Sequence, residues 1–141
     1  MSGAPFSGAK LAVLVGDALL VMLRDDRDDI PYPDRWDLPG GGREGSETPL
    51  RCALRETREE LSLEIAPEAV HWGRDFPGTR PGQDRVWFFA TRDDGLDLGR
   101  VRLGDEGQRW ALMPVAEYLA HPRAIAPLVE RLRVYLAERG A

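Results

Sequence analysis

Two short apolar runs stand close together near the start of the chain. They cover residues 11–15 and 18–23 and are separated by Gly16 and Asp17. Glycine supplies the positive φ that a tight turn between strands requires, so this pattern predicts a β-hairpin. The polar stretch that follows, residues 24–35, is rich in aspartate and contains Pro31 and Pro33. We expect it to form a surface loop.

The next segment combines a short strand, a turn and a helix. Trp36–Leu38 predicts a strand, and Pro39–Gly42 predicts a turn because consecutive glycines disfavour regular structure. Thr48 is a suitable N-cap and Pro49 a suitable first helical residue. The run 50–61 contains no Gly or Pro, so it is the clearest helix prediction in the sequence.

The second half of the chain mixes strand-like and helical patterns. Strand patterns cover residues 69–76 and 85–91, loops 93–95 and 103–107, and helical patterns 114–120 and 126–138. Gly140 is a natural stop for the last helix. The mixture predicts an α/β or α+β fold with helices packed on a sheet.

Composition narrows the possible partners. A chain of 141 residues fits one domain, and its 43% hydrophobic and 30% charged residues are ordinary for a globular protein. The net charge of −5 argues against nucleic acid and anionic membranes as partners. Residues 1–10 lack a secretory pattern, and the apolar stretch 11–23 is too short and too broken to span a bilayer. With a single cysteine, Cys52, no intramolecular disulfide can form, and we expect a cytoplasmic protein.

The predicted helix has an acidic face. At about 100° per residue, Glu59, Glu56 and Glu60 all fall within about 140° of Arg55, whereas most apolar residues fall on the adjoining face. Carboxylates this close repel one another unless a positive charge lies between them, and a hard divalent cation such as Mg²⁺ is suited to oxygen ligands. The alternative is a solvated acidic face with ordinary ion pairs. Cys52 falls on the polar side of the wheel, where we expect a bystander and not a nucleophile.

The spacing of these residues resembles the signature of the Nudix hydrolase family, G-x5-E-x7-R-E-U-x-E-E-x-G-U, in which U is a bulky apolar residue. The positions that fit in register are Gly41, Glu47, Arg55, Glu56, Glu59, Glu60 and Leu63. There are two departures. Thr57 stands where an apolar residue is usual, and Ser62 replaces the glycine that normally ends the helix.

The resemblance implies a single Nudix domain over residues 1–141, folded as an α/β/α sandwich with a mixed β-sheet between helices. It also implies Mg²⁺-dependent hydrolysis, with Mn²⁺ able to substitute, of a pyrophosphate bond in a nucleoside diphosphate linked to a further group. The implied metal ligands are Glu56, Glu59, Glu60, the carbonyl of Gly40, and Glu106. Arg55 and Glu47 would hold the loop and helix in place.

Three residues outside the signature are further candidates by resemblance. Glu106 lies in a loop similar to one that carries a metal ligand or general base in MutT-type members, with Asp105 as its nearest competitor. Arg24, at the end of the second strand, is similar to a phosphate-contacting arginine, although a solvated strand-end arginine explains it equally well. Trp87 is a candidate for nucleotide contact; alternation sends only one of Trp87 and Phe88 towards the site, and core packing is the alternative for both.

The substrate implied by the resemblance is a small-molecule nucleotide. A MutT-like chain would convert a nucleoside triphosphate, oxidised or not, to the monophosphate and pyrophosphate. Ile125 falls where MutT has a purine-contacting asparagine and brings no amide, so ADP-ribose, nucleotide sugars and dinucleoside polyphosphates stay open as substrates. A sensor that binds nucleotide without cleaving it is the alternative of another class. We expect a monomer or homodimer.

Overall fold

The predicted hairpin begins the fold. In the computed structural model, which describes residues 5–139, β1 (Phe6–Val15) and β2 (Ala18–Leu23) are antiparallel and are joined through Gly16, whose φ is 60°. β1 then makes a long parallel pairing with β6 (Arg85–Arg92), and β6 pairs antiparallel with β5 (Val70–Pro77). The sheet is therefore mixed, as expected.

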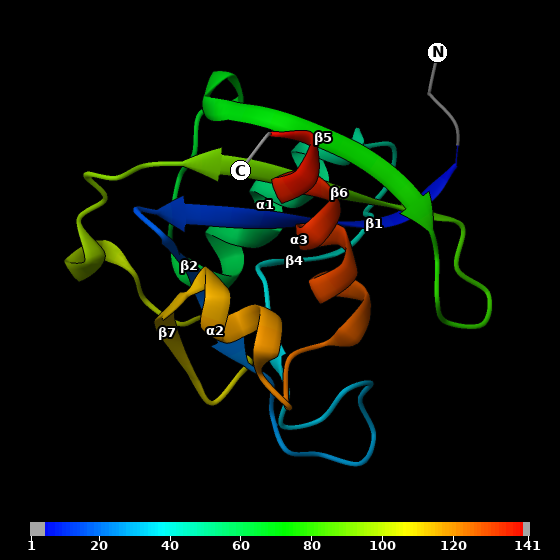
Figure 1. Ribbon diagram of the computed structural model, residues 1–141. Helices are drawn as coiled ribbons and strands as arrows, with labels where there is room; N and C mark the ends of the chain where they lie inside the picture. The colour runs from blue at the N-terminus through cyan, green and yellow to red at the C-terminus, as the bar shows by residue number, and fades with distance from the viewer. Residues whose placement is uncertain (1–4, 140–141) are drawn as a thin grey trace.

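Helices cover both faces of this sheet (Figure 1). α1 (Pro49–Leu61) lies on one face, and α2 (Val115–Ala120) and α3 (Ala126–Glu138) lie on the other. Each face has its own apolar core: Ala53 and Leu61 of α1 belong to one, and Tyr118 and Leu132 of α2 and α3 belong to the other. The predicted α/β/α sandwich is confirmed.

α1 begins and ends close to where the sequence predicts. The side chain of Thr48 accepts a hydrogen bond from the Arg51 N–H at 3.3 Å, which satisfies one of the free donors of the first turn. At the other end Ser62 adopts the left-handed conformation, with a φ of 60°. Glycine takes this conformation without strain, so Ser62 ends the helix at a conformational cost.

The expectation that Pro39–Gly42 is only a turn is wrong. Residues Gly40–Gly42 form β4, which pairs antiparallel with β1. The glycines permit this pairing because the two backbones approach closely: a Cβ added to Gly8 would lie 2.5 Å from the Gly41 carbonyl oxygen. One added to Gly40 would collide with the backbone of Ala9 and Lys10.

A second strand that was not predicted is β7 (Arg109–Pro114), which pairs with β2 along its whole length. Its sequence is only partly buried and does not alternate cleanly, so periodicity alone does not distinguish it from a loop. The predicted stop at Gly140 lies outside the described residues. Among the residues that are described, none forms a helix long and apolar enough to cross a membrane.

The path of β1 creates the opening that holds the site. β1 pairs with β2 only at the hairpin end, at Leu14 and Val15, whereas at its other end it pairs with β4. β3 (Trp36–Asp37) pairs with the far end of β2. β1 and β2 therefore diverge, and the segment 36–42 runs between them.

Candidate active site

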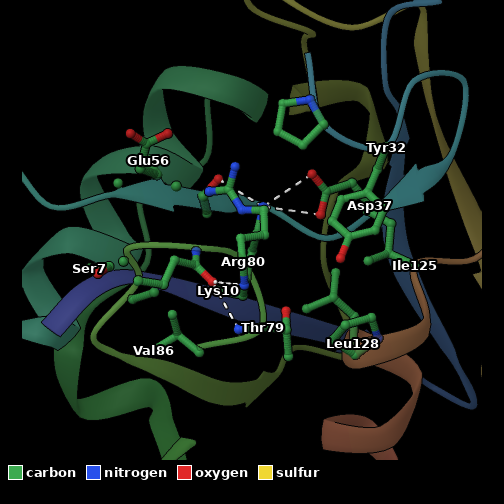
Figure 2. Close-up of a pocket in the computed structure, with 18 of the residues that line it drawn as sticks. Ser7, Lys10, Tyr32, Asp37, Glu56, Thr79, Arg80, Val86, Ile125 and Leu128 are labelled. Carbon is green, nitrogen blue, oxygen red and sulfur yellow. Dashed lines mark hydrogen bonds and ion pairs between the residues drawn. The ribbon is translucent and has the colours of Figure 1, made fainter. Parts of the chain in front are cut away.

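A cavity of about 390 Å³ opens where β1 and β2 diverge. Segments from across the chain line it: β1, β4, α1, the loop 24–35, the β5–β6 loop, and the start of α3. Figure 2 shows Glu56 on one side of the cavity and Tyr32, Asp37, Ile125 and Leu128 on the opposite side. The cavity therefore has an acidic helical wall and a facing wall of different character.

Arg55 organises the acidic wall. Its guanidinium binds both carboxylate oxygens of Glu47, at 2.8 and 3.0 Å, and donates to the Gly42 carbonyl at 2.9 Å. It also reaches Glu56 at 3.0 Å and Glu59 at 3.1 Å. The hydrogen bonds from Arg55 lower the pKa of Glu47 to about 2, and those same bonds raise the pKa of Arg55. This bidentate pair fastens the loop before α1 onto the helix.

Glu56 lies against the glycine-rich strand. A Cβ added to Gly41 would lie 2.6 Å from the Glu56 carboxyl carbon, so only glycine leaves room for this carboxylate. Burial raises the pKa of Glu56, and the hydrogen bond from Arg55 opposes that rise. Gly41 therefore has a steric role beside the acidic wall.

Glu60 is the more buried of the neighbouring carboxylates. It accepts the Gly40 N–H at 2.8 Å. Burial raises the pKa of Glu60 to about 7, and the positive charge of Lys10 opposes the rise. Glu59, by contrast, is half exposed. The three glutamates of one helix face therefore lie in three different environments.

These side chains fit a hard divalent cation. Glu56 and Glu60 line the same cavity, and burial penalises the charge on both, which a cation between them would relieve. Within residues 5–139, no three acidic, His or Cys side chains already converge as a ligand cluster. The Gly40 carbonyl, also expected as a ligand, accepts a hydrogen bond from the Lys10 ammonium at 3.1 Å.

The cavity also holds a cationic group around Asp37, of which sequence reasoning named only Arg24. Asp37 is buried and accepts from Lys10 at 3.0 Å and from Arg24 at 3.0 Å. The Leu38 N–H donates to the same carboxylate at 2.8 Å. Arg24 also donates to the Pro31 carbonyl, at 2.9 Å. The only lysine of the chain, within a largely apolar strand, was the available signal, as was an aspartate between Trp36 and Leu38.

The structure separates the two acidic candidates in the loop 103–108. Both are exposed, but Glu106 lines the cavity and Asp105 does not. The loop is fastened to neighbouring elements: the Gly104 N–H donates to the Glu60 carbonyl at 2.9 Å, and the Gln108 amide donates to the Arg24 carbonyl at 2.8 Å.

Trp87, Phe88 and Cys52 have distinct surroundings. Trp87 is half-buried, lines the cavity and stacks on Phe89 with ring centroids 5.5 Å apart. Phe88 is fully buried in the core on the other face of the sheet, beneath α2 and α3. Cys52 is not on a polar surface as the wheel suggested. It is buried beneath the Gly41 carbonyl, and this burial raises the thiol pKa to about 12, so the thiol stays neutral.

The rest of the facing wall comes from residues that the sequence did not single out. Ile125, noted for lacking an amide, is at the cavity, and it is joined by further lining residues: Tyr32, Arg80, Val86, Leu128 and Arg131. They come from three segments far apart in the chain: the loop 24–35, the β5–β6 connection with the start of β6, and α3 with the residue before it. No local spacing links them, so only the fold reveals their proximity.

Sequence comparison identifies one family over most of the chain. The family model described as NUDIX domain matches residues 7–133. The RNA pyrophosphohydrolase of Acidiphilium cryptum (strain JF-5) is 32% identical, over 89% of this chain and 84% of that protein. The RNA pyrophosphohydrolase of Bartonella henselae (strain ATCC 49882 / DSM 28221 / CCUG 30454 / Houston 1) is 41% identical, over 54% of this chain and 50% of that one.

Solved structures share the fold. A MutT protein from Methanosarcina mazei Go1 has a TM-score of 0.74 at 17% identity and covers 96% of both chains. A bifunctional NMN adenylyltransferase/ADP ribose pyrophosphatase from Francisella tularensis, complexed with AMP and a Mn ion, has a TM-score of 0.76 at 21% identity. It matches 98% of this chain, which spans 42% of the Francisella chain.

Proposed function

Because the chain belongs to the Nudix family of pyrophosphohydrolases, we propose that it hydrolyses a pyrophosphate bond in a nucleoside diphosphate linked to a further group. The main substrate is a nucleoside triphosphate, which yields the monophosphate and pyrophosphate. The observation that carries this proposal is one cavity lined by Glu56 and Glu60 together with Lys10 and Arg24. A polyphosphate bound there would meet both cations and metal-binding carboxylates.

The cofactor in this proposal is Mg²⁺, held by Glu56, Glu59 and Glu60 with the Gly40 carbonyl and Glu106. When bound, a divalent cation at such a site neutralises phosphate charge and lowers the pKa of a water molecule. The Francisella structure is complexed with a Mn ion, which supports a divalent cation here and leaves Mg²⁺ itself to experiment.

The protein's own residues have separate tasks in this mechanism. Lys10 and Arg24 bind phosphate oxygens, and Asp37 holds the two cations side by side. The attacking water transfers its proton to a carboxylate among Glu56, Glu59, Glu60 and Glu106. Arg55 and Glu47 keep the acidic helix and the glycine-rich strand in register, and Trp87 contacts the nucleotide from the β6 side.

A nucleotide panel with Mg²⁺ tests the proposal when pyrophosphate and phosphate are resolved as products. The variants Glu59→Gln and Glu60→Gln should lower kcat by about a hundredfold or more, the scale of losing one charge-stabilising group. Glu64→Gln, an exposed glutamate just beyond α1, is the matched control. Near-normal turnover by both test variants would refute the assignment of these carboxylates.

A 5′-triphosphorylated RNA end is a second candidate substrate. The relatives named RNA pyrophosphohydrolase support it, and the same phosphate site would serve it. The net charge of −5 favours the free nucleotide. Adding a triphosphorylated oligonucleotide, ADP-ribose and a nucleotide sugar to the panel separates these substrates, and tight binding without turnover would indicate a sensor. Three further features stay predictions: a single domain over residues 1–141, a cytoplasmic location, and a monomeric or homodimeric state.

A further inference from the structure

The cavity has an apolar end beside its phosphate-binding end. Tyr32, Ile125 and Leu128 line this apolar end. Figure 2 shows Tyr32 on the same side of the cavity as Ile125 and Leu128, across from Glu56. A nucleotide with its phosphates near Lys10 and Arg24 would extend its base in this direction.

Tyr32 has two properties that packing does not explain. It is the one large hydrophobic residue exposed in the described range 5–139, with 36% of its surface accessible. Its φ is 51°, in the left-handed region that a bulky side chain rarely adopts. Such backbone strain persists only where surrounding structure enforces it, and it is common at ligand sites.

The loop around Tyr32 is fastened on both sides. Before it, the Pro31 carbonyl accepts from Arg24 at 2.9 Å. After it, the Asp34 carbonyl accepts two hydrogen bonds from Arg123, at 2.8 and 3.0 Å, and the Asp34 carboxylate accepts from Gln108 at 2.8 Å. These contacts hold the aromatic ring at the rim of the cavity, so its exposure does not result from a free loop.

The surface beside Tyr32 is aliphatic. Ile125 and Leu128 are 5% and 3% exposed and belong to the core between the sheet and α3. An aromatic ring with an aliphatic surface beside it can contact a planar group, because every base offers an apolar face for stacking.

Amide side chains, which can read the edge of a base with both a donor and an acceptor, are few in this cavity. The one amide among the lining residues described here is Gln83, and its oxygen accepts the N–H groups of Thr79 and Arg80 at 3.0 and 3.1 Å. Arg131 supplies only donors, and acceptors are present on every base. Stacking without edge recognition does not discriminate strongly among bases.

We propose that Tyr32 stacks on the nucleobase beside Ile125 and Leu128, and that this contact makes the enzyme bind nucleoside triphosphates with little regard to the base. The inference rests on the proposed function and assigns the nucleoside half of the same site. Tyr32 is a specificity-determining residue in this arrangement and takes no part in proton transfer.

Steady-state kinetics on ATP, GTP, CTP and UTP test the inference with Tyr32→Ala, Tyr32→Phe and the exposed loop control Asp28→Ala. Loss of one stacking contact should raise KM about tenfold for all four substrates in Tyr32→Ala, with kcat little changed. Tyr32→Phe keeps the ring and should stay within about twofold of wild type, as should Asp28→Ala. The substituted side chain is exposed, so thermal unfolding of Tyr32→Ala should match wild type.

The outcomes separate this inference from the proposed function. A rise in KM below about threefold in Tyr32→Ala, or kcat/KM values for the four bases that differ by more than about a hundredfold in wild type, would overturn it. An equal loss in Tyr32→Phe would also overturn it, because the ring would then not be what matters. If wild type cleaves none of the panel, it is the proposed function that fails.

Discussion

The two walls of the cavity differ in charge and in how the chain forms them. One wall comes from a continuous stretch, residues 40–60, and carries carboxylates that Arg55 and the glycine-rich strand hold in place. The facing wall comes from segments that are distant in the chain and carries cations around Asp37 beside apolar side chains. The difference suggests a division of labour, in which the helical wall supplies reaction chemistry and the assembled wall selects the substrate.

Removing Arg55 should have the largest effect on the helical wall. Arg55 and Glu47 are both about 15% exposed at the side chain, so Arg55→Ala leaves a mostly buried carboxylate without its partner. We expect a loss of about 3–5 kcal/mol in the free energy of unfolding. Urea denaturation measures it, with the exposed Arg51→Ala as control. A loss no greater than that of the control would contradict the role given to this pair.

Two carboxylates of the helical wall should give the metal-free protein opposite responses to pH. Arg55 lowers the pKa of Glu47 to about 2, so its stabilising contribution is present above about pH 4.5 and is lost as pH falls towards 2. Burial raises the pKa of Glu60 to about 7. The folded state therefore binds an extra proton between about pH 4.5 and 7, and stability declines as pH rises through that window.

Thermal unfolding in the presence of a chelator, measured across pH 2–8, follows both dependences of stability on pH. The rise in the Glu60 pKa from 4.5 to about 7 changes the free energy of unfolding by about 3–4 kcal/mol between the two limits. Glu60→Gln should abolish the loss of stability as pH rises towards 7 and should leave the loss of stability below pH 4.5 unchanged. Glu47→Gln should reduce the loss of stability below pH 4.5. If both variants keep the wild-type profile, burial does not distinguish these two groups.

A smaller effect is expected on the facing wall. Arg24→Ala removes a charge-assisted contact to phosphate, so KM for the nucleotide should rise about tenfold while kcat changes less. Lys10 keeps Asp37 as its partner, which limits the structural damage. Arg27→Ala, an exposed arginine on the same loop that pairs with Asp29, is the control. An equal effect of the two substitutions would remove the distinction between the walls.

The same contrast explains what could be predicted from the sequence. The residues of the helical wall lie on successive turns of one helix, so their spacing alone predicts a shared face, and the structure places Glu56 and Glu60 at the cavity. Lys10, Asp37 and Tyr32 meet only after strand pairing and loop closure, which no local period encodes. A lysine in an apolar strand and an aspartate between Trp36 and Leu38 signal that each needs a buried partner, but they do not identify it.

Backbone elements also divide into those set by neighbouring residues, which the sequence predicts, and those set by distant ones. The hairpin, α1 and its N-cap at Thr48 depend on neighbouring residues and were predicted. β4 and β7 depend on partners elsewhere in the sheet. Three glycines form a strand here because Gly8 on β1 lets the two backbones meet, a condition set by a segment some thirty residues earlier in the chain.

The most direct test of the whole account is the kcat of Glu59→Gln and Glu60→Gln on the preferred nucleotide with Mg²⁺, beside Glu64→Gln. We expect both test variants to lose about a hundredfold or more while the control keeps wild-type turnover, because we assign Glu59 and Glu60, but not Glu64, to the proposed metal site. Turnover near that of wild type in both test variants would show that the helical wall does not carry the chemistry.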